Sequence, residues 1–154
     1  ISISEVIGPD GHLYTYDLRE DMSQKSQLNL KTILPNSNNV TFKTGDVSHQ
    51  IDEHEIDAII LDLPEPWEVV DQALNSLKYG GIIISFLPTI IQVSNYVDKL
   101  RDCLQFTLIE TTELLERSWT VGGRSIRPDH RMTGHTGFIT VARKCFVRPD
   151  KESK

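Results

Sequence analysis

The sequence lacks several features that mark membrane, secreted and metal-binding proteins. No apolar run approaches the roughly 20 residues of a membrane-spanning helix, and no basic-then-apolar leader opens the chain. The two cysteines, Cys103 and Cys145, have no metal-ligand spacing, and no Ser lies in a nucleophile-elbow sequence. We therefore expect no metal ion, no membrane partner, and a cytoplasmic protein whose thiols are reduced.

A glycine-rich turn between a strand and a helix is also missing. In doubly wound α/β sheets such a turn follows the first strand and cradles a phosphate or a cofactor. Residues 1–7 alternate apolar residues with Ser or Glu, contain no initiator Met, and look like the end of an element that starts earlier.

The composition is otherwise that of one ordinary globular domain with a sizeable core. We expect one domain over residues 1–147 and a charged, frayed tail over residues 148–154. The net charge of −6 argues against a protein that coats nucleic acid along its whole surface. Basic residues nevertheless gather in residues 117–144, where Asp129 is the only acid. This segment is either a solvated basic face or a phosphate-binding surface.

Strand and helix patterns alternate along the chain. Apolar runs predict strands over residues 12–18, 40–43, 56–62 and 82–87, and helical spacing predicts helices over residues 19–34, 67–77 and 88–104. Gly80 and Gly81 are expected to end the second of these helices. Two late strands, residues 106–116 and 136–142, have no helix between them. This order predicts an α/β, doubly wound, Rossmann-like sheet with an antiparallel terminal strand pair.

The most informative stretch is residues 56–67. Its apolar half predicts a buried strand, and Pro64 and Pro66 force the chain out of the sheet directly after Asp62. Ligands bind at the carboxyl ends of strands in open α/β sheets. Asp62, with the rigid turn of Pro64 and Trp67 behind it, could hold a flat polar group against a wall. The alternative is that Asp62 caps the next helix.

Carboxylates follow three successive predicted strands. Asp17 stands where nucleotide-binding folds place an acid that accepts hydrogen bonds from a ribose diol. Asp46 ends the next strand, within reach of an adenine amino group, and Asp62 ends the third. The alternative is three independent turn or cap aspartates. Two histidines of a later glycine-containing turn, His130 and His135, could contact phosphate or cap the final strand.

Four segments together resemble the tRNA adenine-N1-methyltransferases, a family of class I methyltransferases that depend on S-adenosylmethionine. The segments are Tyr-Asp-Leu-Arg at residues 16–19, Gly-Asp-Val at 45–47, Asp-Leu-Pro-Glu-Pro-Trp at 62–67 and Arg-Pro-Asp-His-Arg-Met-Thr-Gly-His-Thr-Gly-Phe at 127–138. The match covers nearly the whole chain in order. The proline-rich turn and the final Gly-His-Thr-Gly-Phe motif are specific to this family within the superfamily.

The resemblance implies a cofactor site at the first two strand ends. Asp17 would hold the ribose hydroxyls of S-adenosylmethionine, and Leu18 and Met22 would pack near its adenine. Asp46 would accept from the adenine amino group, with Val47 beside the ring.

The resemblance also implies that Asp62 is the catalytic residue. It would lie by the methyl donor and accept the amino group of a target adenine from the tRNA T-loop, flipped out of its stack, so that N1 faces the sulfonium. The remaining predicted substrate contacts are Pro64 and Trp67 at the turn and Arg124, Arg127, Arg131 and His135 toward the tRNA.

The chain departs from the family in two respects. Asp17 replaces the more usual Glu, and the first strand, the glycine-rich motif and a small N-terminal β domain are missing. Because that first strand belongs in the middle of the sheet, its absence would leave buried backbone unpaired, and we expect the chain to be a fragment of a longer protein.

The resemblance implies a homotetramer for the intact protein. Apolar residues of the terminal strands could serve that interface or fill the core of the monomer; they are Phe106, Leu108, Ile109, Phe138, Ile139 and Val141. Two other functions stay open. One is a non-catalytic tRNA-binding partner subunit, and the other is a dehydrogenase-like nucleotide-binding domain, which no motif in the proline-rich turn supports.

Overall fold

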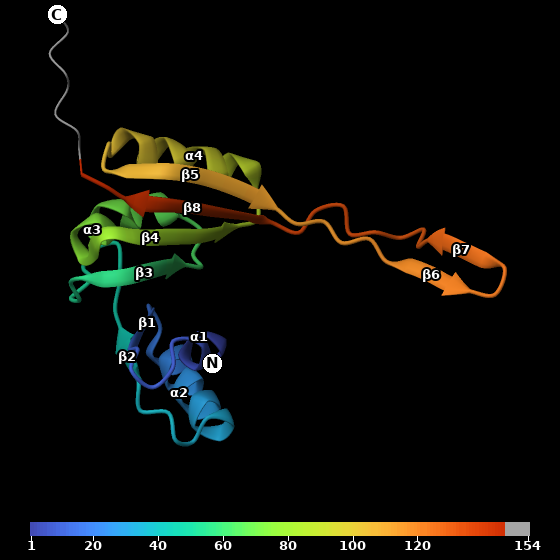
Figure 1. Ribbon diagram of the computed structural model, residues 1–154. Coiled ribbons are helices and arrows are strands. Elements are labelled where there is room, and N and C mark those ends of the chain that lie inside the picture. The colour runs from blue at the N-terminus through green and yellow to red at the C-terminus, as the bar shows by residue number, and fades with distance from the viewer. Residues whose placement is uncertain (147–154) are drawn as a thin grey trace, which may run out of the picture. The chain divides into compact units, whose positions relative to one another are not determined.

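The computed structural model describes residues 1–146 (Figure 1). The predicted charged tail, residues 148–154, lies outside the described residues. The chain divides into two compact units, Ile1–Ile51 and Asp52–Lys154, here called the N-terminal and C-terminal units. The predicted catalytic domain over residues 1–147 spans both. Within residues 1–146, no helix combines the length and the apolar character needed to cross a membrane.

The N-terminal unit is a strand–helix–strand motif preceded by a short helix. Its elements are α1 (Ser2–Val6), β1 (Leu13–Asp17), α2 (Glu20–Ile33) and β2 (Val40–Thr44). The two strands are parallel and in register from Leu13 opposite Val40 to Asp17 opposite Thr44. Leu30 is the buried apolar residue of α2. The predicted strands and helix are confirmed here, and residues 1–7, expected to end an earlier element, contain α1.

The C-terminal unit is built on a four-stranded sheet. Its elements from β3 to β5 are β3 (Ile56–Leu61), the 3₁₀ helix η1 (Pro66–Val69), α3 (Val70–Ser76), β4 (Leu77–Leu87), α4 (Ile90–Asp102) and β5 (Phe106–Glu113). Strand β8 (Phe138–Lys144) lies between β4 and β5 in the order β3-β4-β8-β5. β3 and β4 are parallel, and β8 runs antiparallel to both of its neighbours. The predicted antiparallel terminal pair is thus confirmed.

Helices α3 and α4 pack against one face of this sheet. Ile83 and Leu87 of β4 are fully buried, and so are Tyr96 and Leu100 of α4. Each such apolar side chain contributes roughly 1.5–3 kcal/mol when it leaves water. Phe86, which alternates with Ile83 and Leu87 on the strand, is 45% exposed. The core therefore fixes β4 and α4 relative to each other, and with them the carboxyl edge of the sheet.

The predicted helix over residues 67–77 was wrong at its end. α3 stops at Ser76, and Leu77 already begins β4. Gly80 and Gly81, expected to end the helix, instead lie inside β4, where pairing with β3 jumps from the Leu77 partner to the Ile82 partner. Gly80 has φ +82°, and a Cβ on Gly81 would lie 2.9 Å from the Lys78 carbonyl oxygen. The glycines permit an irregularity in a strand.

A β-hairpin that the sequence analysis missed projects from the sheet. β6 (Trp119–Gly122) and β7 (Ser125–Pro128) are antiparallel, and Gly122 pairs with Ser125 across a two-residue turn. Gly123 opens this turn with φ +53°, as the tight turns of hairpins require. Figure 1 shows the hairpin reached by extended segments from β5 and β8. β5 ends at Glu113 rather than at the predicted residue 116.

Candidate functional site

The first two strand ends meet at one edge of the N-terminal unit. β1 and β2 are parallel, and the Gly45 N–H donates to the Asp17 carbonyl oxygen at 3.1 Å. The half-buried Asp17 carboxylate accepts the backbone N–H of Arg19 through Oδ1 at 2.9 Å. This bond fixes the carboxylate beside the start of α2, and both oxygens keep lone pairs able to accept from a ligand hydroxyl.

Asp46 follows β2 and forms a tight local turn. Its Oδ1 accepts the Ser48 hydroxyl at 2.6 Å and the Ser48 backbone N–H at 2.9 Å, and His49 Nδ1 lies 3.9 Å from Oδ2. The side-chain hydrogen bond from Ser48, then the backbone one, holds the pKa of Asp46 below its usual value. Asp46 therefore does stabilise a turn, which was one of the two roles that the sequence allowed. Its Oδ2 faces His49.

The other predicted cofactor residues adjoin these two carboxylates. Leu18 is 69% exposed directly after Asp17, while Met22 and Val47 are half-buried. An exposed apolar side chain next to acceptor oxygens is the chemistry that suits a nucleoside, which presents a flat ring, an amino group and a diol. The residues present thus fit the nucleoside portion of the predicted cofactor.

Asp62 comes directly after β3 in the C-terminal unit and is exposed. It does not cap the next helix, because Glu65 is the N-cap residue of η1. The turn has buried anchors at both ends, Leu61 on the strand and Pro66 at the start of η1. In its middle, the Pro64 carbonyl oxygen accepts the side-chain N–H of Gln92 at 3.0 Å. Asp62 is therefore presented on a turn attached to α4.

The start of α4 is held by a side-chain cap. Thr89 is the N-cap residue, and the Gln92 backbone N–H donates to its hydroxyl oxygen at 3.4 Å. The Thr89 hydroxyl donates to Gln92 Oε1 at 2.6 Å. The same glutamine thus closes the cap with one end of its amide and reaches the Asp62 turn with the other.

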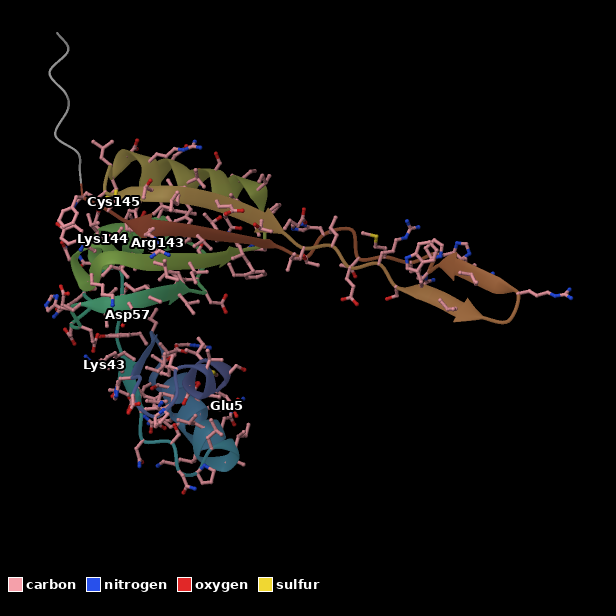
Figure 2. All side chains as sticks on the ribbon, in the orientation of Figure 1. Glu5, Lys43, Asp57, Arg143, Lys144 and Cys145 are labelled. Carbon is pink, nitrogen blue, oxygen red and sulfur yellow. The ribbon has the colours of Figure 1, made fainter. Side chains whose placement is uncertain are left out.

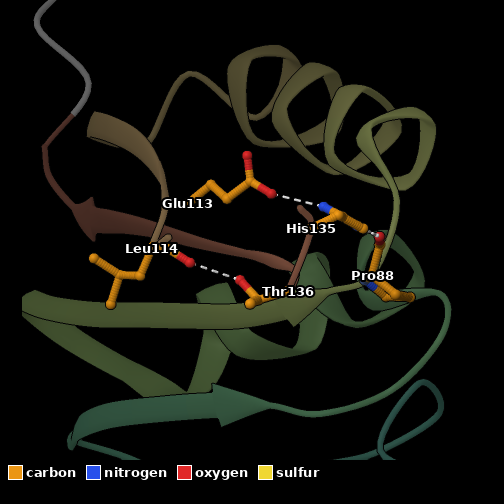
Figure 3. Close-up of polar contacts among 5 residues, drawn as sticks. All are labelled: Pro88, Glu113, Leu114, His135 and Thr136. Carbon is orange, nitrogen blue, oxygen red and sulfur yellow. Dashed lines mark hydrogen bonds and ion pairs between the residues drawn. The ribbon is translucent and has the colours of Figure 1, made fainter. Parts of the chain in front are cut away.

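His135 joins three segments at the same edge of the sheet (Figure 3). Its Nδ1 lies 2.6 Å from Glu113 Oε1 at the end of β5, and its Nε2 lies 2.5 Å from the Pro88 carbonyl oxygen after β4. The Thr136 hydroxyl donates to the Leu114 carbonyl oxygen at 2.8 Å. The bond to Pro88, followed by the bond to Glu113, raises the pKa of His135. Both ring nitrogens are therefore occupied by protein acceptors.

Gly137 completes this arrangement. It has φ +140°, and a Cβ there would lie 2.5 Å from Cζ of Phe86. The backbone conformation therefore favours glycine here, and any added side chain would also have to displace the Phe86 ring. The Gly-His-Thr-Gly sequence that carried the family resemblance positions the start of β8 against the ends of β4 and β5.

Trp67 lines a groove to which Asp62 does not contribute. The half-buried indole lines this groove between η1, α3 and α4, whose other lining residues are Glu68, Asp71, Asn95, Asp98, Lys99 and Asp102. Lys99 pairs with Asp71 across this groove at 2.8 Å. Pro64 is exposed at the turn itself. The substrate roles of Pro64 and Trp67 stay predictions.

The basic segment separates into two groups in space. Arg124 forms the hairpin turn, Arg127 is on β7, and Arg131 follows it; all three are exposed. Arg143 and Lys144 lie instead at the far end of β8 (Figure 2), where they donate to backbone carbonyl oxygens of Gly80, Leu74 and Leu77. The first group has no hydrogen bond to backbone carbonyl oxygens of the described residues and is the better candidate for binding a polyanion. In the described part of the chain, no three His, Cys, Asp or Glu side chains are arranged to hold a metal ion.

The sequence analysis missed Gln92, Thr89 and Glu113. A signal for the first two was present, because Thr89-Ile-Ile-Gln92 has the spacing of a capping box at a helix start. Glu113 carried no signal, since nothing in the linear sequence pairs it with a histidine more than twenty residues later.

One protein-family description matches most of the chain. Residues 1–130 match the family described as "tRNA methyltransferase complex GCD14 subunit". A Methanocaldococcus jannaschii protein named tRNA (adenine(57)-N(1)/adenine(58)-N(1))-methyltransferase TrmI is 36% identical over 92% of this chain and 58% of its own length. A Thermus thermophilus protein named tRNA (adenine(58)-N(1))-methyltransferase TrmI is 27% identical over 92% of this chain and 55% of its own length. The chain thus spans little more than half of these relatives.

Two solved structures share the fold. A Thermotoga maritima protein described as a SAM-dependent O-methyltransferase superposes with a TM-score of 0.87 at 33% identity, over 96% of this chain and 55% of its own. The Aquifex aeolicus tRNA (m1A58) methyltransferase TrmI superposes with a TM-score of 0.76 at 26% identity, over 88% of this chain and 54% of its own. The Rossmann-like methyltransferase fold predicted from the sequence is confirmed.

Proposed function

This chain belongs to the family of GCD14 subunits of the tRNA methyltransferase complex, and from that premise we propose that it is part of a catalytic domain that methylates N1 of an adenine in the tRNA T-loop. The observation that carries the proposal is the exposed Asp62 on its anchored proline turn at the carboxyl end of β3. The names of the related proteins specify adenine 58, or adenines 57 and 58, and these are the positions to test.

The proposed cofactor is S-adenosylmethionine, which supplies an electrophilic methyl group when bound. Asp17 would accept hydrogen bonds from the ribose diol with the lone pairs that the bond from the Arg19 N–H leaves free. Asp46 would accept from the adenine amino group, with Val47 beside the ring. Leu18 and Met22 would cover the adenine, and the exposed Leu18 side chain is available for that contact.

Asp62 would act on the target base. Its carboxylate would accept the exocyclic amino group of the flipped adenine and so turn N1 toward the methyl donor. N1 of adenine is already a nucleophile, so orientation of the two reactants supplies most of the rate, and no general base is needed. A rigid turn suits that task better than a mobile loop, because misplacement by about 1 Å can cost a hundredfold in rate.

The exposed basic hairpin supports a tRNA-binding role. Arg124, Arg127 and Arg131 would neutralise phosphates of the tRNA, and His135 would order the base of the hairpin that carries them. The place of action would then be the cytoplasm, whose reducing environment keeps thiols such as those of Cys103 and Cys145 unpaired.

The hairpin also supports assembly of the intact protein, for which we propose a homotetramer. Trp119, Val121 and Ile126 are 59%, 74% and 69% exposed, an unusual apolar content for a solvated hairpin. Of the terminal-strand residues considered for this interface, Phe106 is only 6% exposed and belongs to the core, whereas Leu108 is 72% exposed. A monomeric mass of the intact protein in light scattering would contradict the assembly.

A non-catalytic tRNA-binding subunit is the second candidate, and the carboxylates argue against it. Asp17 and Asp46 also hold local turns, but the presence of all three carboxylates, Asp17, Asp46 and Asp62, at three strand ends favours the catalytic subunit. The proposal is tested with the intact protein, labelled S-adenosylmethionine and tRNA transcripts with adenine or guanine at positions 57 and 58. We expect methyl incorporation that requires one of these adenines, and a loss of about 10²–10³-fold in Asp62→Ala, which removes the acceptor oxygens. Full activity of Asp62→Ala would remove Asp62 from catalysis.

A further inference from the structure

Gln92 makes a long-range hydrogen bond that its position in the sequence does not predict. It stands three residues after the N-cap Thr89, the position from which a capping-box Gln or Glu reaches back to the N-cap backbone N–H. Here the half-buried side chain contacts the Thr89 hydroxyl and the Pro64 carbonyl group instead. Its Oε1 accepts a hydrogen bond from the Thr89 hydroxyl at 2.6 Å. Its Nε2 donates to the carbonyl oxygen of Pro64, 28 positions earlier in the sequence, at 3.0 Å.

We propose that Gln92 is a positioning residue that sets the orientation of Asp62 for methyl transfer, an inference that rests on the proposed function. The contact links the N-terminus of α4 to Pro64, which lies midway between Asp62 and the buried Pro66. Pro64 has a fixed φ, so holding its carbonyl group constrains the direction in which the chain leaves Asp62.

The chemistry of the contact requires a glutamine. A backbone carbonyl only accepts hydrogen bonds, so the group facing Pro64 must be the NH₂ of the amide, and the Thr89 hydroxyl then donates to the amide oxygen. A glutamate has the same length and would still accept from Thr89. It would place a carboxylate oxygen against the Pro64 oxygen, where two acceptors repel each other.

The support behind Gln92 is firm. α4 is fixed to the sheet by fully buried Tyr96 and Leu100. Directly before Thr89, the Pro88 carbonyl oxygen is held by His135. The start of α4 is therefore fixed on two sides, and Gln92 carries that rigidity to a turn that projects into solvent.

The glutamate substitution separates the two roles that Gln92 could have. If Gln92 only caps α4, then Gln92→Glu is harmless, because Glu is favoured at this position and near a helix N-terminus. If Gln92 positions Asp62, then Gln92→Glu is as damaging as Gln92→Ala. Gln72→Glu on α3 is the matched control for the added negative charge.

The experiment uses the intact protein, tRNA and S-adenosylmethionine, with single-turnover methyl transfer, separate dissociation constants for both ligands, and Tm. We expect Gln92→Glu and Gln92→Ala to lower the single-turnover rate by between about tenfold and a hundredfold. Both dissociation constants, the Tm of Gln92→Glu and the rate of Gln72→Glu should equal those of the unmodified protein.

Three results would overturn the inference. A Gln92→Glu rate equal to that of the unmodified protein would reduce Gln92 to a cap. A rate that falls only together with Tm or ligand affinity would make the residue structural. An unmodified protein that transfers no methyl group to tRNA would refute the proposed function as well, and this outcome is recognised before any variant is compared.

Discussion

The imidazole of His135 and the carboxylate of Glu113 form a 2.6 Å hydrogen-bonded ion pair that joins the start of β8 to the end of β5. The second ring nitrogen of His135 faces another acceptor, the Pro88 carbonyl oxygen. A neutral imidazole has one N–H and cannot donate to both. The geometry therefore favours the imidazolium form, and the ring of Phe138 packs beside it at 5.2 Å between centroids.

This arrangement makes the stability of the C-terminal unit depend on pH. The pKa of His135 is raised above the value of 6.5 that the unfolded chain has. The folded state consequently binds the proton more tightly, so the stabilisation is complete below pH 6.5 and is lost as the pH rises through the raised pKa. The difference in Tm between the unmodified protein and His135→Ala should be largest in mild acid and shrink in alkali.

The control for that experiment is His54→Ala, which removes an exposed histidine from the same unit. Its Tm should follow that of the unmodified protein at every pH. A constant Tm difference for His135→Ala across the whole range would mean that the ring contributes through packing alone.

Gly137 should not tolerate a side chain. Gly137→Ala places a Cβ 2.5 Å from the Phe86 ring at a φ that L-residues rarely adopt, and we expect a loss of about 1–3 kcal/mol in the free energy of unfolding. Gly134→Ala, three residues earlier in open space, should change it little. Urea denaturation of both variants measures the difference. Equal stabilities would show that β4 and β8 adjust to the added methyl group.

Asp17→Ala should weaken S-adenosylmethionine binding much more than tRNA binding. Loss of a hydrogen-bonded charged acceptor costs about 1.5–3 kcal/mol, or roughly a tenfold to hundredfold rise in Kd. Calorimetry with each ligand separately measures both constants. Asp10→Ala, an exposed aspartate of the same unit, is the control. If Asp17→Ala weakens both ligands equally, the carboxylate serves mainly to hold the Arg19 turn.

The hairpin arginines should control the salt dependence of tRNA binding. In an Arg124→Ala, Arg127→Ala double variant, each lost phosphate contact should flatten the slope of log K against log salt by about 0.7–0.9 unit, with unchanged cofactor affinity. Arg101→Ala on the exposed side of α4 should leave the slope as it was. An unchanged slope in the double variant would leave residues 123–128 as a structural turn.

Local patterns predicted most of the fold because they are set by neighbouring residues. The strand before Asp62 followed from its apolar run, and its end followed from two prolines that cannot continue a sheet. The antiparallel terminal pair followed from the lack of a connecting helix. The end of α3 did not follow, because Leu77 continues the helical apolar spacing while its burial against β3 draws it into β4.

Contacts between distant segments were beyond such patterns. The hairpin had a local signal in Gly122-Gly123, a turn dipeptide with Thr120 and Val121 before it and Ile126 after it. Its exposed strands bury no face, however, and so show no alternation toward a core. Gln92 with Pro64 and His135 with Glu113 are brought together only by the packing of α4 and β8. For Asp46, the sequence allowed either a turn or an adenine-binding role. The carboxylate stabilises the turn through Oδ1, and the proposed adenine contact uses the same side chain.

The position of β8 has a consequence for how the C-terminal unit is made on the ribosome. Among residues 1–146, β8 is the last strand along the chain, yet it supplies the hydrogen bonds on one side of both β4 and β5. Those two strands cannot be joined until the chain has been synthesised through Lys144, so during translation each waits with an open edge. A nascent chain stalled before Phe138 should therefore be open to proteases and to pairing with other chains, and release of the final strand should close the sheet in a single late event.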